Sequence, residues 1–156
     1  MVKKSAGIVA FRYRDDLLEV LLAHPGGPFW AKKDLASWSI PKGEYEDTED
    51  AFTVAQQEFF EETGFVAQGE FIQLTPVKQP GGKIVSVWAV KGDFDASCAG
   101  SNTFTMEWPK KSGIFQDFPE VDRVQWFPVA IAKEKLLKGQ VGILDQLCEL
   151  LGTDPP

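Results

Sequence analysis

The chain has 156 residues, of which 44% are hydrophobic and 12% aromatic, a composition typical of a globular domain large enough to bury a core. Its 16 basic and 23 acidic residues give a net charge of −7, which argues against general binding to nucleic acid or to anionic membranes. No apolar run approaches the ~18 residues of a membrane span, and Cys98 and Cys148 lack metal-site spacing. We therefore expect one cytoplasmic domain over residues 1–156, with free thiols.

Two strands open the predicted sheet, over Ser5–Arg14 and Leu17–His24, with a turn at the two aspartates between them. Pro25 ends the second strand, and a loop with aromatic and lysine side chains follows. Trp30 in this loop has a ring suited to stack on a base in the wall of a substrate site. The alternative is an ordinary surface loop with one anchoring aromatic residue.

The stretch from Gly43 to Phe65 contains the most informative pattern of the chain. It predicts a helix that begins after Asp50, an N-cap residue type, and ends at Gly64, the usual residue type at C′. Apolar side chains recur within it at i, i+3 and i+7, as on the buried stripe of a helix: Phe52, Ala55 and Phe59.

Three carboxylates lie beside that stripe. Glu58, Glu61 and Glu62 have i, i+3 and i+4 spacing, which places them on one helical face where they repel one another. A hard divalent cation removes the conflict, because carboxylate oxygens suit Mg²⁺ or Mn²⁺. The alternative is an acidic helix face that only contacts water.

The rest of the chain alternates between strand and helix patterns. Strands are expected over 71–77, 83–90, 101–108 and 124–127, and helices over 129–137 and 140–151, the last with an apolar face of Ile143, Leu147, Leu150 and Leu151. Glu107 alternates away from the apolar side of its strand and is expected to face the cleft. Residues 109–119 lack periodicity, and we expect a loop over the site, with Lys110 and Lys111 available to phosphates, or else a plain solvated loop.

The acidic stretch resembles the Nudix box. The resemblance rests on the glycines and glutamates in register and on the apolar positions between them: Gly43, Glu49, Glu58, Phe59, Glu61, Glu62, Gly64 and Phe65. One position departs, because Gln57 stands where the family has arginine, and a neutral amide does not replace a guanidinium. The resemblance implies an α/β (α+β) fold, with a mixed sheet sandwiched between helices.

The resemblance also implies a function. A Nudix hydrolase of this kind uses Mg²⁺ or Mn²⁺, held by Glu58, Glu61 and Glu62, to cleave a diphosphate bond in a nucleoside diphosphate linked to another group. The run Trp38 to Gly43 is similar to the segment before the box in dinucleoside polyphosphate hydrolases, so a dinucleoside polyphosphate is the expected substrate. The resemblance implies that Trp38, Lys42 and Gly43 form part of the substrate site, with Lys42 and Gly43 facing the phosphates.

The sequence does not decide which glutamate is the catalytic base. Glu61 is one candidate, and the family resemblance adds a carboxylate from outside the box, for which Glu107 and Glu120 both qualify. Glu58 is counted with the catalytic residues as a holder of the metal.

Two other functions remain as alternatives. The neutral Gln57 favours a catalytically weakened module that binds or senses a nucleotide. A diphosphate-ester isomerase needs a reactive cysteine or a glutamate pair, and Cys98 has no evident activating base. The expected partner is a small nucleotide, without nucleic acid or membrane, and a homodimer is left open.

Overall fold

The computed structural model describes residues 3–152 of the chain. The strands are β1 (Lys4–Arg14), β2 (Leu17–Pro25), β3 (Lys42–Glu44), β4 (Phe71–Gln73), β5 (Val77–Lys78), β6 (Ile84–Lys91), β7 (Thr103–Glu107), β8 (Phe115–Pro119) and β9 (Val121–Pro128). The helices are α1 (Ala51–Thr63), α2 (Val129–Lys135) and α3 (Val141–Leu151), with 3₁₀ turns η1 (Ala96–Cys98) and η2 (Lys138–Gln140). The predicted helices and strands appear in the expected order, but the 71–77 strand divides into β4 and β5, and the strands β3 and β8 were not predicted.

The main sheet is mixed. Its order is β4-β6-β1-β2-β9, with β3 added to β1 and β5 added to β6. β1 and β6 run parallel, whereas β1 and β2 form the predicted antiparallel hairpin. Asp15 and Asp16 connect that hairpin with φ values of 52° and 65°, the left-handed conformation that two-residue hairpin turns of this type require and that aspartate tolerates better than most residues.

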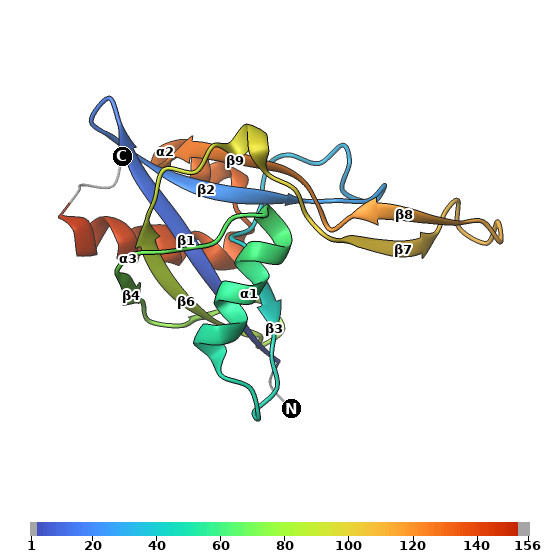
Figure 1. Cartoon of the computed structure of the whole chain (residues 1–156), viewed down its shortest axis with the longest axis horizontal. Helices are drawn as coiled ribbons and strands as arrows, with labels where there is room; N and C mark the ends of the chain where they lie inside the picture. Colours follow the sequence, from blue (N-terminus) through green and yellow to red (C-terminus); the bar gives the residue numbers. More distant parts are fainter. Residues whose placement is uncertain (1–2, 153–156) are drawn as a thin grey trace.

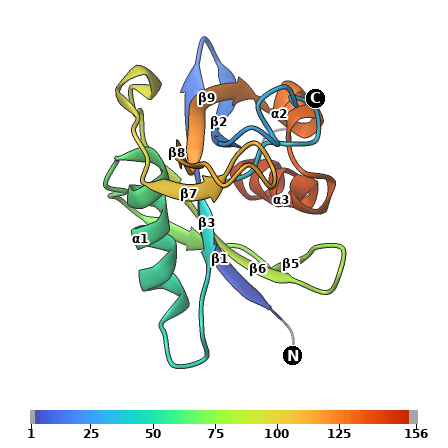
Figure 2. The same ribbon diagram turned by 90° about the vertical axis from the view of Figure 1, so that its right-hand side faces the viewer.

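Alternating side chains of β1 build a core on each face of the sheet. Ala6, Ile8 and Ala10 pack in one cluster with residues of α1, whereas Val9 and Phe11 pack in the other with residues of α2 and α3. Figure 2 shows α1 on one side of the sheet and α2 and α3 on the other. The predicted sheet between helices is confirmed.

Helix α1 begins and ends where the sequence predicted. The carboxylate of the N-cap Asp50 accepts a hydrogen bond from the Thr53 backbone N–H at 3.0 Å, and Gly64 follows the last turn with φ 80°. Ala55 and Phe59 are 0% exposed, and the ring of Phe52 packs against Phe71 and Trp88. The apolar stripe therefore fixes the rotation of α1 and with it the direction of the glutamates.

The buried face of α3 differs from the prediction at one position. Ile143 and Leu147 are buried as expected, but Leu150 is 46% exposed, and Leu144 and Cys148 take its place in the core. Leu151, in the same last turn, is partly buried against the core. None of the helices within residues 3–152 has the length and apolar character needed to cross a membrane.

Residues 103–119 form an antiparallel hairpin in place of the expected strand and loop. β7 and β8 pair only with each other, and Figure 1 shows them projecting from the body as an arm. Side-chain bonds support the arm: the Thr105 hydroxyl donates to Asp117, and the Gln116 amide donates to the Trp108 carbonyl at 2.7 Å. Lys110 and Lys111 lie in the turn at its far end, so the prediction of a loop over the site is wrong.

The rotation of α1 gives a test by paired substitutions. Phe59→Ala removes a fully buried ring and should lower the free energy of unfolding by about 3–5 kcal/mol. Phe60→Ala is the matched control, since that ring is 53% exposed, and it should change stability by no more than about 0.5 kcal/mol. Urea unfolding followed by fluorescence measures both. Equal losses would contradict this orientation of the helix.

Candidate active site

The backbone of β3 lies directly against the carboxylate of Glu58. A Cβ atom added to Gly43 would stand 2.1 Å from the carboxyl carbon of Glu58, far inside any allowed contact. Glycine at this position therefore leaves room for the Glu58 side chain next to β3. This explains why Gly43 precedes the acidic helix.

Burial and mutual repulsion raise the pKa values of two carboxylates on α1, Glu58 and Glu62. Burial raises the pKa of Glu58, and Glu61 and Glu120 raise it further. Burial and the nearby Glu58 raise the pKa of Glu62 to about 8, although Lys42 opposes the shift. The metal-free site thus keeps Glu62 mostly protonated at neutral pH.

Glu120 joins this cluster from the other end of the chain. It lies between β8 and β9, where the chain returns from the arm to the main sheet. Its charge raises the pKa values of both Glu58 and Glu62. A cavity of about 190 Å³ has walls that include Lys42, Glu62 and Glu120. Its other walls are mostly apolar: Ala23, Pro25, Ser39, Val121 and Leu137. The structure therefore brings Glu120 to the box.

Two lysines lie on the opposite side of the carboxylates. Burial lowers the pKa of Lys42, and the neighbouring ammonium of Lys83 lowers it further. Lys83 also pairs with Glu44 at 3.6 Å. No local sequence pattern points to Lys83, because it comes near Lys42 through the parallel pairing of β6 with β1, which joins distant segments of the chain.

The donor set is suited to a hard cation. Among residues 3–152, no three His, Cys, Asp or Glu side chains already stand together as a complete metal-binding group. Magnesium, however, is usually bound through one or two carboxylates, with water and substrate phosphates as its other ligands. Crowded, half-buried carboxylates beside a phosphate-sized cavity fit that mode of binding.

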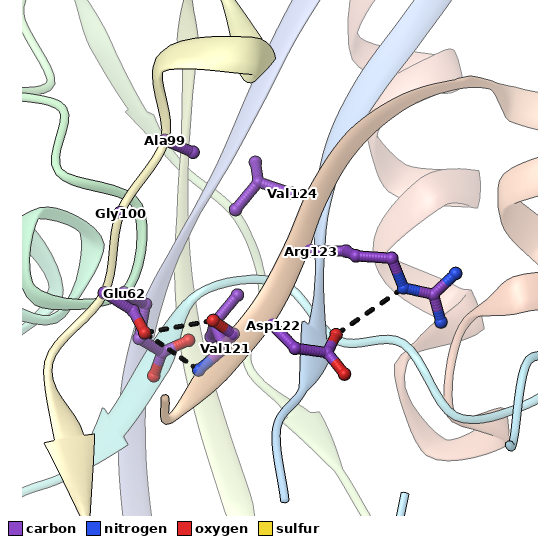
Figure 3. A pocket seen from close by; sticks show the side chains of 8 residues that line it. Glu62, Ala99, Gly100, Val121, Asp122, Arg123 and Val124 are labelled. Atoms are coloured by element: carbon purple, nitrogen blue, oxygen red, sulfur yellow. Dashed lines mark hydrogen bonds and ion pairs between the residues drawn. The ribbon is translucent and has the colours of Figure 1, made fainter. Parts of the chain in front are cut away.

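A smaller cavity of about 30 Å³ lies behind Glu62, between α1 and β9 (Figure 3). Gly100 and Val121 form part of its walls, with Ser101 between them. Its volume is near that of one water molecule in the liquid. The side of Glu62 turned away from the larger cavity thus faces the segment from which the arm departs.

Three predicted site residues lie elsewhere. Glu107 accepts hydrogen bonds from the backbone N–H groups of Lys111 and Gly113, at 3.0 and 3.2 Å, and so closes the far turn of the arm. Trp38 is 1% exposed in the core, where its indole N–H donates to Asp34. Glu107 is therefore not the outside carboxylate of the site, and the Trp38 ring offers no surface for a substrate.

Trp30 lies in the loop after β2. Its ring meets Phe29 at 5.2 Å between centroids, and the Lys33 ammonium lies over both rings. It is not part of the walls of the cavity that contains Lys42 and Glu62. Cys98 is an exposed free thiol in η1, and it is likewise absent from those walls, which removes the main support for the isomerase alternative.

The comparisons agree with this architecture. A family model described as the NUDIX domain matches residues 1–147, whereas no curated protein matches the chain. The NUDIX domain of Shewanella oneidensis NrtR, complexed with ADP ribose, superposes with a TM-score of 0.68 at 21% identity, covering 97% of this chain and 89% of that one. A C. elegans Ap4A hydrolase in a binary complex gives 0.65 at 19%, covering 97% and 98%.

A MutT/nudix family protein from Enterococcus faecalis gives a TM-score of 0.63 at 17% identity, covering 97% of this chain and 63% of that one. At such low identity these structures show a shared fold. The family match covers nearly the whole sequence, and the acidic helix, its capping residues and the sheet between helices agree with it. The chain therefore belongs to the NUDIX domain family, with the architecture of a Nudix pyrophosphohydrolase.

Proposed function

We propose that this Nudix pyrophosphohydrolase depends on Mg²⁺ or Mn²⁺ and cleaves a diphosphate bond in a nucleoside diphosphate linked to another group. The observation that supports this most is that Glu62, Glu120 and Lys42 line one cavity, with Glu58 close enough for its charge to act on Glu62. Carboxylates forced together raise the free energy of the empty site, and a cation lowers it. The lysine supplies positive charge for the phosphates.

Glu58, Glu61 and Glu62 would hold the cation, with Glu120 within reach of the same charge. When bound, such an ion neutralises phosphate oxygens and makes water a stronger nucleophile. The protein supplies the rest. Gly43 leaves room for the Glu58 side chain next to β3, and either Glu61 or Glu120 would accept the proton of the attacking water.

Lys42 and Lys83 would contact the phosphates together. Two ammonium groups close to each other repel in the free protein, and a bound polyanion relieves that repulsion. The cavity is smaller than the 300–1,000 Å³ typical of sites that enclose a whole ligand. It therefore suits the reacting phosphates, while the attached nucleosides extend outward.

The substrate proposal is a dinucleoside polyphosphate or a related compound with a long phosphate chain. It rests on the segment before the box and on the shared fold with an Ap4A hydrolase. Free Cys98 and Cys148 fit a reducing cytoplasm, where such nucleotides occur as small-molecule partners. We propose that residues 1–156 act as one domain.

A second candidate is a catalytically weakened domain that mainly binds a nucleotide. Gln57 favours it, because the site lacks the positive charge that the family pattern places beside the first glutamate of the trio. The NUDIX domain of NrtR is known in complex with ADP ribose, which shows that this fold accommodates such a ligand.

Phosphate release separates the two functions. Dinucleoside polyphosphates and nucleotide sugars should be hydrolysed with Mg²⁺ and not with EDTA. Glu58→Gln should lower the rate by about a hundredfold, because it removes an anionic oxygen from the cation. Glu149→Gln makes the same chemical change at an exposed position of α3 and should leave the rate unchanged. Micromolar binding without turnover of any substrate would support the binding module instead.

Stability should depend on pH through Glu62. Because folding raises its pKa from 4.5 to about 8, the metal-free protein gains stability below pH 4.5 and loses it as the pH rises through 8. The full difference is on the order of 5 kcal/mol. Thermal unfolding in EDTA between pH 5.5 and 9 should show this decline, and Glu62→Gln should flatten it. Parallel pH profiles for the two proteins would contradict the raised pKa.

The neutral position 57 gives a further prediction. Gln57→Arg should raise the turnover rate several-fold if the missing charge limits the enzyme, since a guanidinium stabilises carboxylates that must stay ionised. Gln56→Arg adds the same charge about 100° away around the helix and should have less effect. Steady-state kinetics on the best substrate measures both. An unchanged or slower Gln57→Arg enzyme would mean that the charge is compensated elsewhere.

A further inference from the structure

The arm joins the body through a short neck, which consists of residues 100–102 on the way out and residues 120–121 on the way back. The Ser101 hydroxyl bridges the two sides. Its Oγ accepts a hydrogen bond from the Val121 N–H at 3.0 Å, and it lies 3.0 Å from the Val121 carbonyl and 2.9 Å from the Asn102 carbonyl. Either carbonyl can accept the hydroxyl proton.

The outgoing side of the neck is fastened to the end of α1. The backbone N–H groups of Asn102 and Gly100 donate to the carbonyls of Glu61 and Thr63 at 2.9 and 3.0 Å. Both carbonyls belong to the last turn of the helix, where no donor is available within the helix itself. The neck therefore completes the helix that carries the acidic residues.

The returning side of the neck carries Glu120. Its backbone N–H donates to the Asn102 carbonyl at 2.8 Å, and its carbonyl accepts from the Gly26 N–H at 2.9 Å. Two consecutive backbone bonds through Asn102 thus connect Glu61 on α1 to Glu120. Figure 3 shows Gly100, Val121 and Glu62 around the small cavity at this place.

From these contacts we infer that Ser101 is a positioning residue that sets the place of Glu120 relative to the acidic face of α1. Its hydroxyl locks Val121, the residue after Glu120, to the outgoing strand, and so limits the rotation of the neck. Without it, two backbone bonds remain to hold an exposed loop residue that must approach a half-buried cluster. The inference rests on the proposed function, since it assigns Ser101 an effect through Glu120.

The test is a double-mutant cycle. Ser101→Ala should lower kcat about tenfold, as expected for a group that orients a site residue, with KM within about twofold. Mn²⁺ affinity without substrate, measured by electron paramagnetic resonance, should weaken several-fold. Ser101→Thr keeps the hydroxyl and should restore both values. Ser97→Ala removes a hydroxyl from the same connection, where it bonds only Asp95, and should change neither.

The decisive comparison uses Glu120→Gln. If Ser101 acts through Glu120, Ser101→Ala should cost less than about twofold in that background. The same tenfold loss in both backgrounds would overturn the inference, as would an unaffected Ser101→Ala enzyme. Should Ser101→Ala unfold at the assay temperature, Ser101→Cys replaces it, because a thiol has similar size but bonds weakly.

Glu58→Gln distinguishes a failure of the inference from a failure of the proposed function. If Glu58→Gln is inactive and Glu120→Gln is as active as the native enzyme, the role of Ser101 is refuted and the proposed function stands. If Glu58→Gln binds Mn²⁺ and turns over normally, the proposed function itself is refuted.

Discussion

The repulsion among the glutamates of α1 is the interaction on which the rest of the site depends. An isolated helix would relieve it by turning these side chains into water. Here the burial of Ala55 and Phe59 fixes the rotation of the helix, and Gly43 leaves room for the Glu58 side chain beside β3. The packing of the apolar side of α1 thus keeps the glutamates close together although they repel one another. A divalent cation bound between them would relieve this repulsion.

Repulsion between like charges also acts on two lysines beside the carboxylates. Lys42 in β3 and Lys83, just before β6, lie on either side of β1. Burial lowers the pKa of Lys42, and repulsion from Lys83 lowers it further. Crowded carboxylates call for a cation and crowded ammonium groups for an anion. A metal ion bound to a polyphosphate carries both charges, so one ligand would relieve the repulsion among the carboxylates and the repulsion between the two lysines.

Local patterns in the sequence predicted the parts of the fold that local interactions build. The caps at Asp50 and Gly64, the apolar stripe of α1 and the β1–β2 hairpin all depend on residues close together in the chain. The failures have a common cause. Residues 109–119 lack periodicity because nearly all of their side chains are exposed, and Glu107 binds the backbone of the turn of the arm. Lys83 and Ser101 reach the site through pairings between distant segments, which no single stretch of sequence reports.

The structure also changes the meaning of the neutral residue at position 57. In the family pattern an arginine helps to hold the first glutamate of the trio, but here the Glu58 side chain lies against Gly43, where no other residue type leaves room for it, and this packing does not involve residue 57. Gln57 lies exposed on the helix, and Glu49 bonds the Glu46 N–H at 2.9 Å within its own loop. The geometry of the site can thus survive the loss of the arginine. The electrostatic effect of the missing arginine is not compensated in this way. Without its charge, Lys42 is the main group that lowers the pKa values of Glu58 and Glu62. Ionisation of these carboxylates therefore depends more strongly on the cation that binds them.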